Sequence, residues 1–278
     1  MDGKTVVITG ATSGIGEVAA ESLARAGARI LFVARSEAKG RALVSRLIRA
    51  NPDAAHDFVL ADLSVLAEMK SAARSLIGKA TKIDVLINNA GAIFDRREVT
   101  VDGLERTFAV NHVAYFVVTE LLLPVLSPQA RIVSTASAAH GFARLDLDDL
   151  QTVQGYSAFG AYGRSKLCNI LWTGELARRL SSTGVTANCV HPGGVNTGFG
   201  DNAKGWLKSV MALGKRFMIT PAQGADTLIW LATSSEVAGR TGGYWSRRRL
   251  LTPSAAARDP ATARRLWLAS ADIAGLAA

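Results

Sequence analysis

The stretch KTVVITGATSGIGEVAAESLARA (residues 4–26) decides the fold class. Its apolar run at 4–9 is typical of a buried strand, and the segment 14–26 is typical of a helix. The turn between them carries Gly10, Gly14 and Gly16, which let the backbone bend sharply and let a phosphate approach the helix N-terminus. The spacing is a variant of the commoner Gly-x-Gly-x-x-Gly, and a glycine-rich turn alone is weak evidence. Between a strand and a helix it predicts a dinucleotide site, which includes Ser13 and Ile15.

The same alternation of strand and helix continues along the chain. Further strands are expected at 29–34, 57–60, 84–88, 131–135, 186–190 and 243–245, and helices at 38–50, 65–80, 104–126, 158–180 and 221–233. Asp259 and Pro260 predict the start of a last helix, with Asp as the cap and Pro in the first turn. This pattern predicts an α/β fold with a Rossmann-type doubly wound parallel sheet of about seven strands and helices on both faces. With no linker or repeat, residues 1–278 are expected to form a single domain.

The composition is typical of a globular protein, but the net positive charge needs an explanation. The chain has 278 residues, is 49% hydrophobic and 20% charged, and carries a net charge of +9. Nucleic-acid binding is one interpretation of such a basic chain. The basic residues are scattered, however, and Arg247-Arg248-Arg249 is the only triplet. We therefore expect no nucleic-acid partner, but a surface with mild attraction for anionic cofactors.

Several features predict a cytoplasmic location. The apolar segment 113–126 is interrupted by Glu120 and Pro124 and is too short to cross a bilayer. The N-terminus enters a strand almost at once, which leaves no room for a signal peptide or a transmembrane anchor. Cys168 and Cys189 give no disulfide framework, so a reducing compartment is expected, with both thiols buried.

Tyr162 and Lys166 are four residues apart on a predicted helix, so their side chains share one face. A phenol with a pKa of about 10 is a poor acid or base at neutral pH. A neighbouring ammonium favours the phenolate, and we expect it to pull the pKa of Tyr162 toward the working range. Alone, the pair would more simply be an exposed helix pair, and the other motifs are needed to favour catalysis.

The end of the second predicted strand bears on the choice of cofactor. An acidic residue there selects NAD through the ribose 2′-hydroxyl, whereas a basic residue accommodates the 2′-phosphate of NADP. This chain has Arg35 at that position. We therefore expect NADP(H), with NAD(H) less favoured.

Taken together, these motifs resemble the short-chain dehydrogenase/reductase family, in its order and over nearly the whole chain. The matching pieces are Thr9–Gly16, Asp62-Leu63, Asn88-Asn89-Ala90-Gly91, Asn111, Ser137, Tyr162-x-x-x-Lys166, and Pro192-Gly193 with Thr197. The closer resemblance is to the retinol dehydrogenase-like branch. It is carried by the sequences at Val110-Asn111-His112, Ser137–His140, YGRSKLCN (162–169) and VHPG (190–193). That branch shares the long insert between Ser137 and Tyr162.

The resemblance implies a role for each matching residue. Tyr162 would exchange the proton with the substrate oxygen, and Ser137 would hydrogen-bond that oxygen. Lys166 would lower the tyrosine pKa and bind the nicotinamide ribose, and Asn111 would position a water in a proton relay. The remaining cofactor contacts would come from Asp62 and Leu63 at the adenine, Asn89, Ala90 and Gly91 at the ribose, and Pro192, Gly193, Val195 and Thr197 at the nicotinamide.

Other parts of the chain give weaker predictions. Residues 198–218 are expected to form a substrate lid for a lipophilic aldehyde, ketone or alcohol, although their large apolar side chains would equally suit core packing or a subunit interface. Residues 250–278 would form a C-terminal extension. His140 and His191 have no second ligand at a suitable spacing, so no metal is expected. The helices at 104–126 and 158–180 resemble the family's dimer-forming surfaces, which implies a homodimer or homotetramer.

The leading hypothesis is an NADP(H)-dependent oxidoreductase that interconverts a carbonyl and an alcohol. A catalytically silent nucleotide-binding sensor or scaffold is the alternative from another class, and it would not need Ser137, Tyr162 and Lys166 together. A sugar-nucleotide epimerase would need a larger C-terminal region. Reduction of a carbon–carbon double bond is a more remote alternative.

Overall fold

The computed structural model describes residues 1–194 and 219–277. One sheet holds the strands β1 (Thr5–Thr9), β2 (Arg29–Ala34), β3 (Asp57–Leu60), β4 (Ile83–Asn88), β5 (Leu126–Thr135), β6 (Thr186–Val190), β7 (Tyr244–Ser246) and β8 (Arg249–Leu251). Their order is β3-β2-β1-β4-β5-β6-β7-β8, and only β7 and β8 pair antiparallel. The main helices are α1 (Gly14–Arg25), α2 (Glu37–Ala50), α3 (Leu66–Lys79), α4 (Arg106–Phe108), α5 (Ala114–Leu122), α6 (Ala158–Arg179), α8 (Pro221–Thr233) and α9 (Pro260–Ala274).

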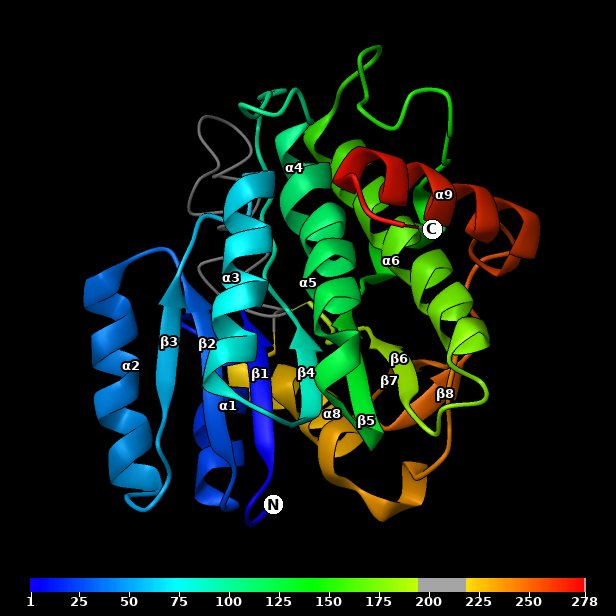
Figure 1. The fold of residues 1–278 in the computed structure, drawn as a ribbon. Helices are drawn as coiled ribbons and strands as arrows, with labels where there is room; N and C mark the ends of the chain where they lie inside the picture. The colour runs from blue at the N-terminus through cyan, green and yellow to red at the C-terminus, as the bar shows by residue number, and fades with distance from the viewer. Residues whose placement is uncertain (195–218, 278) are drawn as a thin grey trace.

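Helices cover both faces of the sheet, as Figure 1 shows. One apolar core joins α1, α2 and α8 to the sheet, and the other joins α3, α5 and α6, with α9 packed outside α6. The central strands β1 and β4 are almost wholly buried because both of their faces meet helices. The predicted doubly wound α/β fold is therefore confirmed.

The helix that follows β4 differs from the single helix predicted at 104–126. It begins at Arg106 and contains a π-helical turn, Ala109–Val113, before α5. A short 3-10 turn with Pro124 ends it. The apolar segment is longer than the 113–126 expected from the sequence: by length and composition alone, the helical stretch Arg106–Val125 could cross a membrane. However, 67% of its most apolar window is buried inside the fold. Burial against α3, α6 and α9 accounts for its apolar character.

One predicted strand differs in its start, and one strand was not predicted. Strand β5 begins at Leu126, five residues before the predicted 131–135. Strand β8 was not predicted because its three residues are exposed and carry no strand periodicity. With β8, the sheet formed by residues 1–194 and 219–277 has eight strands, where about seven were expected. The predicted lid, 198–218, lies outside the described residues, as do Val195 and Thr197.

The C-terminal part, which the sequence set apart as an extension, forms β8 and α9. Asp259 caps α9 by accepting hydrogen bonds from Ala261 N and Thr262 N, and Pro260 starts the helix as predicted. Leu266 and Trp267 of α9 are buried against α6 and α5. The helices that the resemblance gave as dimer surfaces are thus packed against α9 of the same chain, and self-association stays a prediction.

Candidate active site

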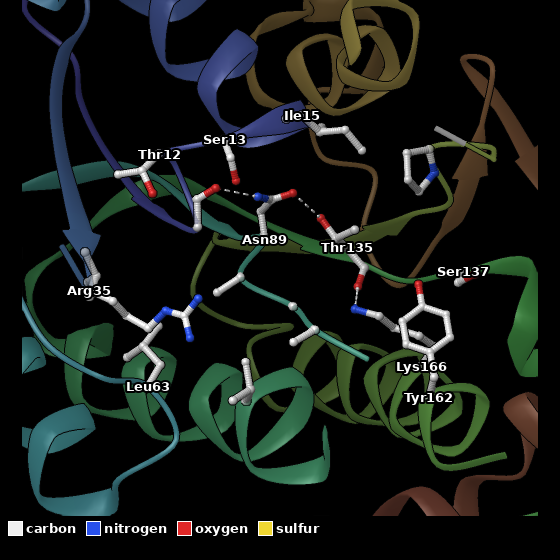
Figure 2. Close-up of a pocket in the computed structure, with 18 of the residues that line it drawn as sticks. Thr12, Ser13, Ile15, Arg35, Leu63, Asn89, Thr135, Ser137, Tyr162 and Lys166 are labelled. Carbon is white, nitrogen blue, oxygen red and sulfur yellow. Dashed lines mark hydrogen bonds between the residues drawn. The ribbon is translucent and has the colours of Figure 1, made fainter. Parts of the chain in front are cut away.

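One pocket runs along the carboxyl ends of the parallel strands (Figure 2). This is where ligands bind in doubly wound sheets, because the crossover loops leave a crevice there. From the predicted site residues it collects Gly10, Ser13, Gly14, Ile15, Arg35, Asp62, Leu63, Asn89, Ala90, Gly91, Ser137, Tyr162, Lys166, Pro192 and Gly193. Segments more than 180 residues apart in sequence therefore meet in one cavity.

The glycine-rich turn after β1 needs its glycines for steric reasons. Gly10 has φ +68° and Gly14 has φ +60°, in the left-handed region that favours glycine. A Cβ on Gly16 would lie 2.2 Å from the Gly10 carbonyl oxygen, which no side chain tolerates. Gly16 does not line the pocket itself; it allows α1 to pack closely under the turn.

The N-terminus of α1 suits an anionic ligand. Ser13 is its N-cap residue, yet the Ser13 side chain makes no capping hydrogen bond. By contrast, Ser36, Ser157 and Thr220 cap α2, α6 and α8 with their side chains. Backbone N–H groups at the start of a helix favour a phosphate through hydrogen bonds and the helix dipole. The residues at this end of the pocket therefore fit the pyrophosphate of a dinucleotide.

Arg35 follows β2 at the same end of the pocket. Its side chain is exposed and makes no ion pair with any residue in 1–194 or 219–277. Figure 2 shows the guanidinium extending into the pocket beside Leu63. Asp62 lies next to Leu63, where its carboxylate accepts a hydrogen bond from Ser64 N at 2.9 Å. This arrangement leaves a cation available to a ligand.

Asn89 holds the strand ends together beneath the pocket. Its amide nitrogen donates to the Gly10 carbonyl at 3.1 Å, and its Oδ1 accepts from Thr135 Oγ1 at 3.2 Å (Figure 2). Thr9 Oγ1 in turn accepts from the backbone N–H groups of Asn89 and Ala90. These bonds tie β1, β4 and β5 to one another, so the Asn89 side chain serves the frame of the pocket.

At the other end of the pocket, Lys166 projects from α6. It is 2% exposed, and its ammonium donates to the Thr135 carbonyl at 2.9 Å. The nitrogen lies 5.4 Å from the ring centre of Tyr115 and 5.7 Å from that of Tyr162. Desolvation by burial lowers the pKa of Lys166 to about 7. The amine can therefore be charged or neutral near physiological pH.

The acidity of Tyr162 differs from the prediction. Burial raises the pKa of the phenol, and a hydrogen bond with Ser137 opposes the rise without reversing it. The sequence predicted a lowered pKa on the assumption of a full cation beside the ring. Burial weakens that cation, since the pKa of Lys166 itself falls. In this structure Tyr162 is therefore protonated at neutral pH.

Two histidines hold the segment that carries Ser137. His140 is buried, and its Nε2 accepts from Ser254 N at 3.2 Å, so Nδ1 carries the proton and donates to the Ser137 carbonyl at 2.7 Å. His191 Nδ1 accepts from Ala138 N at 3.3 Å. His140 lies in the 3-10 turn Ala138–Phe142, and His191 directly follows β6. Their contacts fix the backbone on each side of the Ser137 hydroxyl.

Asn111 lies behind the pocket wall. It is fully buried in the π-helical turn, where Oδ1 accepts from Ala92 N at 2.8 Å and Nδ2 donates to the Ala92 carbonyl at 2.9 Å. A Cβ on Gly91 would lie 3.5 Å from Asn111 Oδ1 and 3.7 Å from Lys166 Nζ, so the three residues are close together. The water relay that the resemblance implies for Asn111 stays a prediction.

Sequence reasoning missed several residues of the site. Thr12, Val33, Ala61, Ala92, Phe94, Val110, Thr135 and Ala136 also line the pocket. For Ala61 and Ala136, which directly follow predicted strand ends, that position was the available signal. Among the residues described, no group of three or more His, Cys, Asp or Glu side chains could hold a metal ion. Cys168 and Cys189 are buried free thiols, as predicted, and burial raises the pKa of each to about 12.

Comparisons with known proteins agree with this geometry. Residues 4–208 match the family model described as short chain dehydrogenase. Mouse retinol dehydrogenase 12 is 39% identical over 277 residues, covering 99% of this chain and 87% of that protein. Human retinol dehydrogenase 14 is 38% identical over 296 residues, covering 99% and 88%. DnrU of Streptomyces sp. (strain C5), provisionally assigned as a daunorubicin C-13 ketoreductase, is 40% identical over 277 residues, covering 99% and 94%.

Solved structures give the same result. An uncharacterised protein from Mycobacterium paratuberculosis superposes with a TM-score of 0.80 at 31% identity, covering 99% of this chain and 94% of that one. The RhlG/NADP active-site complex of Pseudomonas aeruginosa has a TM-score of 0.70 at 25% identity, covering 89% and 95%. Family and relatives together make the protein an oxidoreductase that acts on CH–OH groups with a nicotinamide dinucleotide. The chain belongs to the short-chain dehydrogenase/reductase family, in its retinol dehydrogenase-like branch.

Proposed function

We propose that the protein transfers a hydride between NADP(H) and a lipophilic aldehyde, ketone or secondary alcohol, with Tyr162 as the acid/base. One observation carries the proposal: Tyr162, Ser137 and Lys166 meet at one end of a pocket whose other end is the uncapped start of α1. A dinucleotide that reached from α1 would bring its nicotinamide toward the hydroxyl pair. A structural role alone would not need these groups in one cavity.

The chain's own residues account for the proton and the orientation of the substrate. The nicotinamide, when bound, supplies or accepts the hydride. Tyr162 is protonated at neutral pH because burial raises its pKa, so it can donate to a carbonyl oxygen. The Ser137 hydroxyl would hydrogen-bond the same oxygen and hold it in line. Lys166, when protonated, stabilises the phenolate that forms once the proton has left.

These pKa directions favour carbonyl reduction near neutral pH. Because its pKa is raised, the Tyr162 phenol keeps its proton even when the pH exceeds the ordinary pKa of a tyrosine. Lys166, by contrast, loses its charge as the pH rises through about 7. Reduction is therefore expected to slow on the alkaline side. Alcohol oxidation needs the phenolate and is expected to speed up there. Steady-state rates in both directions between pH 6 and about 10 check this, within the range in which lysine and tyrosine titrate.

Arg35 supports NADP(H) as the cofactor. Its guanidinium enters the adenosine end of the pocket and makes no ion pair within the described ranges, so it is available to a 2′-phosphate. Arg35→Asp is expected to lower kcat/KM for NADPH by about 100-fold and to raise that for NADH, because the carboxylate repels a phosphate and accepts from a hydroxyl. An unchanged ratio of the two values would refute the assignment.

A matched control for this charge change is available. Arg41 is an exposed arginine on α2 that pairs with Glu37 and does not line the pocket. Arg41→Asp alters the net charge by the same amount and should leave the ratio for the two cofactors unchanged. A shift with Arg41→Asp would indicate a general effect of charge.

The substrate proposal rests on the lining and on the relatives. Phe94, Val110 and Ala92 give apolar surface to the pocket. One relative is named as a retinol dehydrogenase and another as a daunorubicin C-13 ketoreductase. A panel of aldehydes, ketones and secondary alcohols, with NADPH absorbance as the signal, tests it. A preference for small polar carbonyls over long-chain or aromatic ones would refute the lipophilic class.

A cytoplasmic location stays a prediction.

Tyr162→Phe separates the enzyme from a catalytically silent nucleotide-binding protein. Removal of the phenol oxygen is expected to reduce turnover by about 1,000-fold or more while NADPH still binds. Tyr156→Phe is the control, because that hydroxyl donates to the Phe94 carbonyl and Tyr156 does not line the pocket. Turnover that persists in Tyr162→Phe would overturn the mechanism. A wild type that binds NADPH but reduces no carbonyl would favour the silent alternative.

A further inference from the structure

Three fully buried polar side chains lie behind Lys166 and take no part in the proposed chemistry. They are His112 of the π-helical turn, Asn169 of α6 and Ser270 of α9, each 0% exposed. None of them lines the pocket. Buried polar groups are costly unless hydrogen-bonded, so their partners indicate what holds them there.

Asn169 connects directly to the carbonyl that holds Lys166. Its amide nitrogen donates to the Asn111 carbonyl at 2.9 Å and to the Thr135 carbonyl at 3.3 Å. The Thr135 carbonyl also accepts from Lys166 Nζ at 2.9 Å. Asn169 follows Lys166 by three residues on the same face of α6. One amide therefore fixes both the acceptor of the ammonium and the turn that carries Asn111.

His112 orients that amide. Because the Asn169 nitrogen is committed to two carbonyls, its Oδ1 faces His112 Nδ1, at 3.2 Å, and this ring nitrogen carries the proton. Burial and the nearby Lys166 lower the pKa of His112 to about 4, so the ring is neutral at pH 7. His112 Nε2 is then an acceptor.

Ser270 extends the chain of hydrogen bonds to the C-terminal helix. Its Oγ lies 3.0 Å from His112 Nε2 and 2.8 Å from the Leu266 carbonyl, and its single proton is donated to one of these two acceptors at a time. Helix α9 packs along α6, so it brings the hydroxyl to the rear of the site. When the hydroxyl donates to Nε2, a continuous path of hydrogen bonds runs from α9 through the ring and the amide to the carbonyl beneath the ammonium.

We propose that Asn169, His112 and Ser270 are positioning residues, through which α9 sets the place of the Lys166 ammonium and of the Asn111 turn. The inference rests on the proposed function, because it concerns the lysine of that site. A purely structural polar cluster would contribute to stability alone. A positioning network also alters the rate of the chemical step, because small displacements of a reacting group are expensive in rate.

Kinetics of three variants distinguish the two roles. Ser270→Ala removes a hydroxyl that is three hydrogen bonds away from the Thr135 carbonyl, and Asn169→Ala removes the amide itself. Ser127→Ala is the matched control: Ser127 is a buried serine whose hydroxyl bonds the Ile83 carbonyl and Asp84 Oδ1, each at 3.0 Å, away from the pocket. For each variant we would measure kcat, the dissociation constant of NADPH by fluorescence titration, and the thermal midpoint.

Ser270→Ala is expected to lower kcat about fivefold and Asn169→Ala about 100-fold, with NADPH affinity unchanged within about twofold. Ser127→Ala should lose a similar thermal stability and keep its kcat. The proposal is overturned if Ser270→Ala and Asn169→Ala keep wild-type kcat. It is equally overturned if Ser127→Ala lowers kcat as much as Ser270→Ala at the same loss of stability. Ser270→Ala decides the matter if Asn169→Ala does not fold.

A structural comparison tests the network without any turnover. In a crystal structure of Ser270→Ala or Asn169→Ala, the Lys166 nitrogen is expected to shift by on the order of 1 Å relative to the wild type. A nitrogen that keeps its place on the Thr135 carbonyl in both variants overturns the proposal. If wild-type enzyme reduces no carbonyl, the proposed function fails, and this comparison still decides whether the network places Lys166.

Discussion

Asp84 and Lys166 are buried ionisable residues at opposite ends of the sheet, and they are bonded very differently. Asp84, at the start of β4, accepts from Thr5 N, Lys4 Nζ and Ser127 Oγ, each at 3.0 Å. Lys166 lies beyond the end of β5 and donates to one carbonyl, at 2.9 Å. They are 7% and 2% exposed, so burial alone does not separate them.

The difference shows in their acidities. Burial disfavours the charged form of both groups. At Asp84 the hydrogen bonds from Thr5, Lys4 and Ser127 outweigh burial, and the pKa falls below 3.8. At Lys166 burial is the resolved cause, and the pKa drops to about 7. A buried charge with a full set of partners stabilises the fold, whereas one with few partners is free to change its protonation state during a reaction.

Lys166→Met gives the largest expected effect on this comparison. Turnover should fall by about 100- to 10,000-fold, because the phenolate loses its neighbouring cation. The free energy of unfolding at pH 7 should not fall, since methionine fills a similar volume without a desolvated amine. Initial rates and urea denaturation measure the two quantities. A variant that keeps its rate but loses stability would reverse the roles assigned to the two ends.

The same variant gives a pH test. The folded pKa of Lys166, about 7, lies below its ordinary 10.5. Between these values the unfolded chain binds one more proton, so stability should rise with pH in the wild type relative to Lys166→Met. Urea denaturation at pH 7 and at about 9, between the two pKa values, checks the sign. Parallel pH dependence in both proteins would contradict it.

Asp84→Ala is the complementary change at the other end of the sheet. It should cost about 2 kcal/mol of unfolding free energy, because Lys4 and Thr5 lose their acceptor, and leave kcat unaltered. The folded pKa is depressed, so this stabilisation is complete above the ordinary value of 3.8 and is lost as the pH falls through the folded pKa. Denaturation at pH 7 and at low pH tests both. A marked loss of kcat would contradict the separation of the two ends.

Glu120 of α5 is a partly buried ionisable residue, and it tests the same rule. Its Oε1 is buried without a hydrogen-bond partner among the described residues, and burial raises its pKa to about 7, opposed by Arg179. The carboxylate therefore weakens the fold increasingly as the pH rises from 4.5 through about 7. Glu120→Gln should gain about 1 kcal/mol at alkaline pH and nothing at pH below about 4.5. If Glu120→Gln and the wild type are equally stable at both pH values, the buried carboxylate of Glu120 does not weaken the fold.

Lys82→Met is expected to have the smallest effect. Lys82 lies 3.4 Å from Asp84 Oδ1, yet its side chain is 58% exposed. Exposed ion pairs contribute about 0–1 kcal/mol, so a change near zero is expected in urea denaturation. A loss as large as that of Asp84→Ala would mean that Asp84 depends on one cation rather than on its several partners.

Local sequence patterns predicted most of the pocket end near the start of α1, and less of the structure around Lys166. The turn between β1 and α1 could be predicted from the sequence because glycine is required where backbone segments pack closely, as at Gly10 and Gly16. The strand β8 and the π-helical turn at Asn111 could not be, because neither has a distinctive periodicity. The lowered tyrosine pKa was wrong because burial of Tyr162 and Lys166 depends on how far the fold encloses them.

Local sequence patterns were enough to predict the doubly wound sheet and the placement of Tyr162 and Lys166 on one face of a helix. These follow from periodicity, turn residues and helical spacing, which act over a few residues. The hydrogen bonds that join His112, Asn169 and Ser270 behind Lys166, and those that surround Asp84, appear only in the folded chain. Those contacts join segments up to 158 residues apart, and desolvation depends on the whole surrounding core.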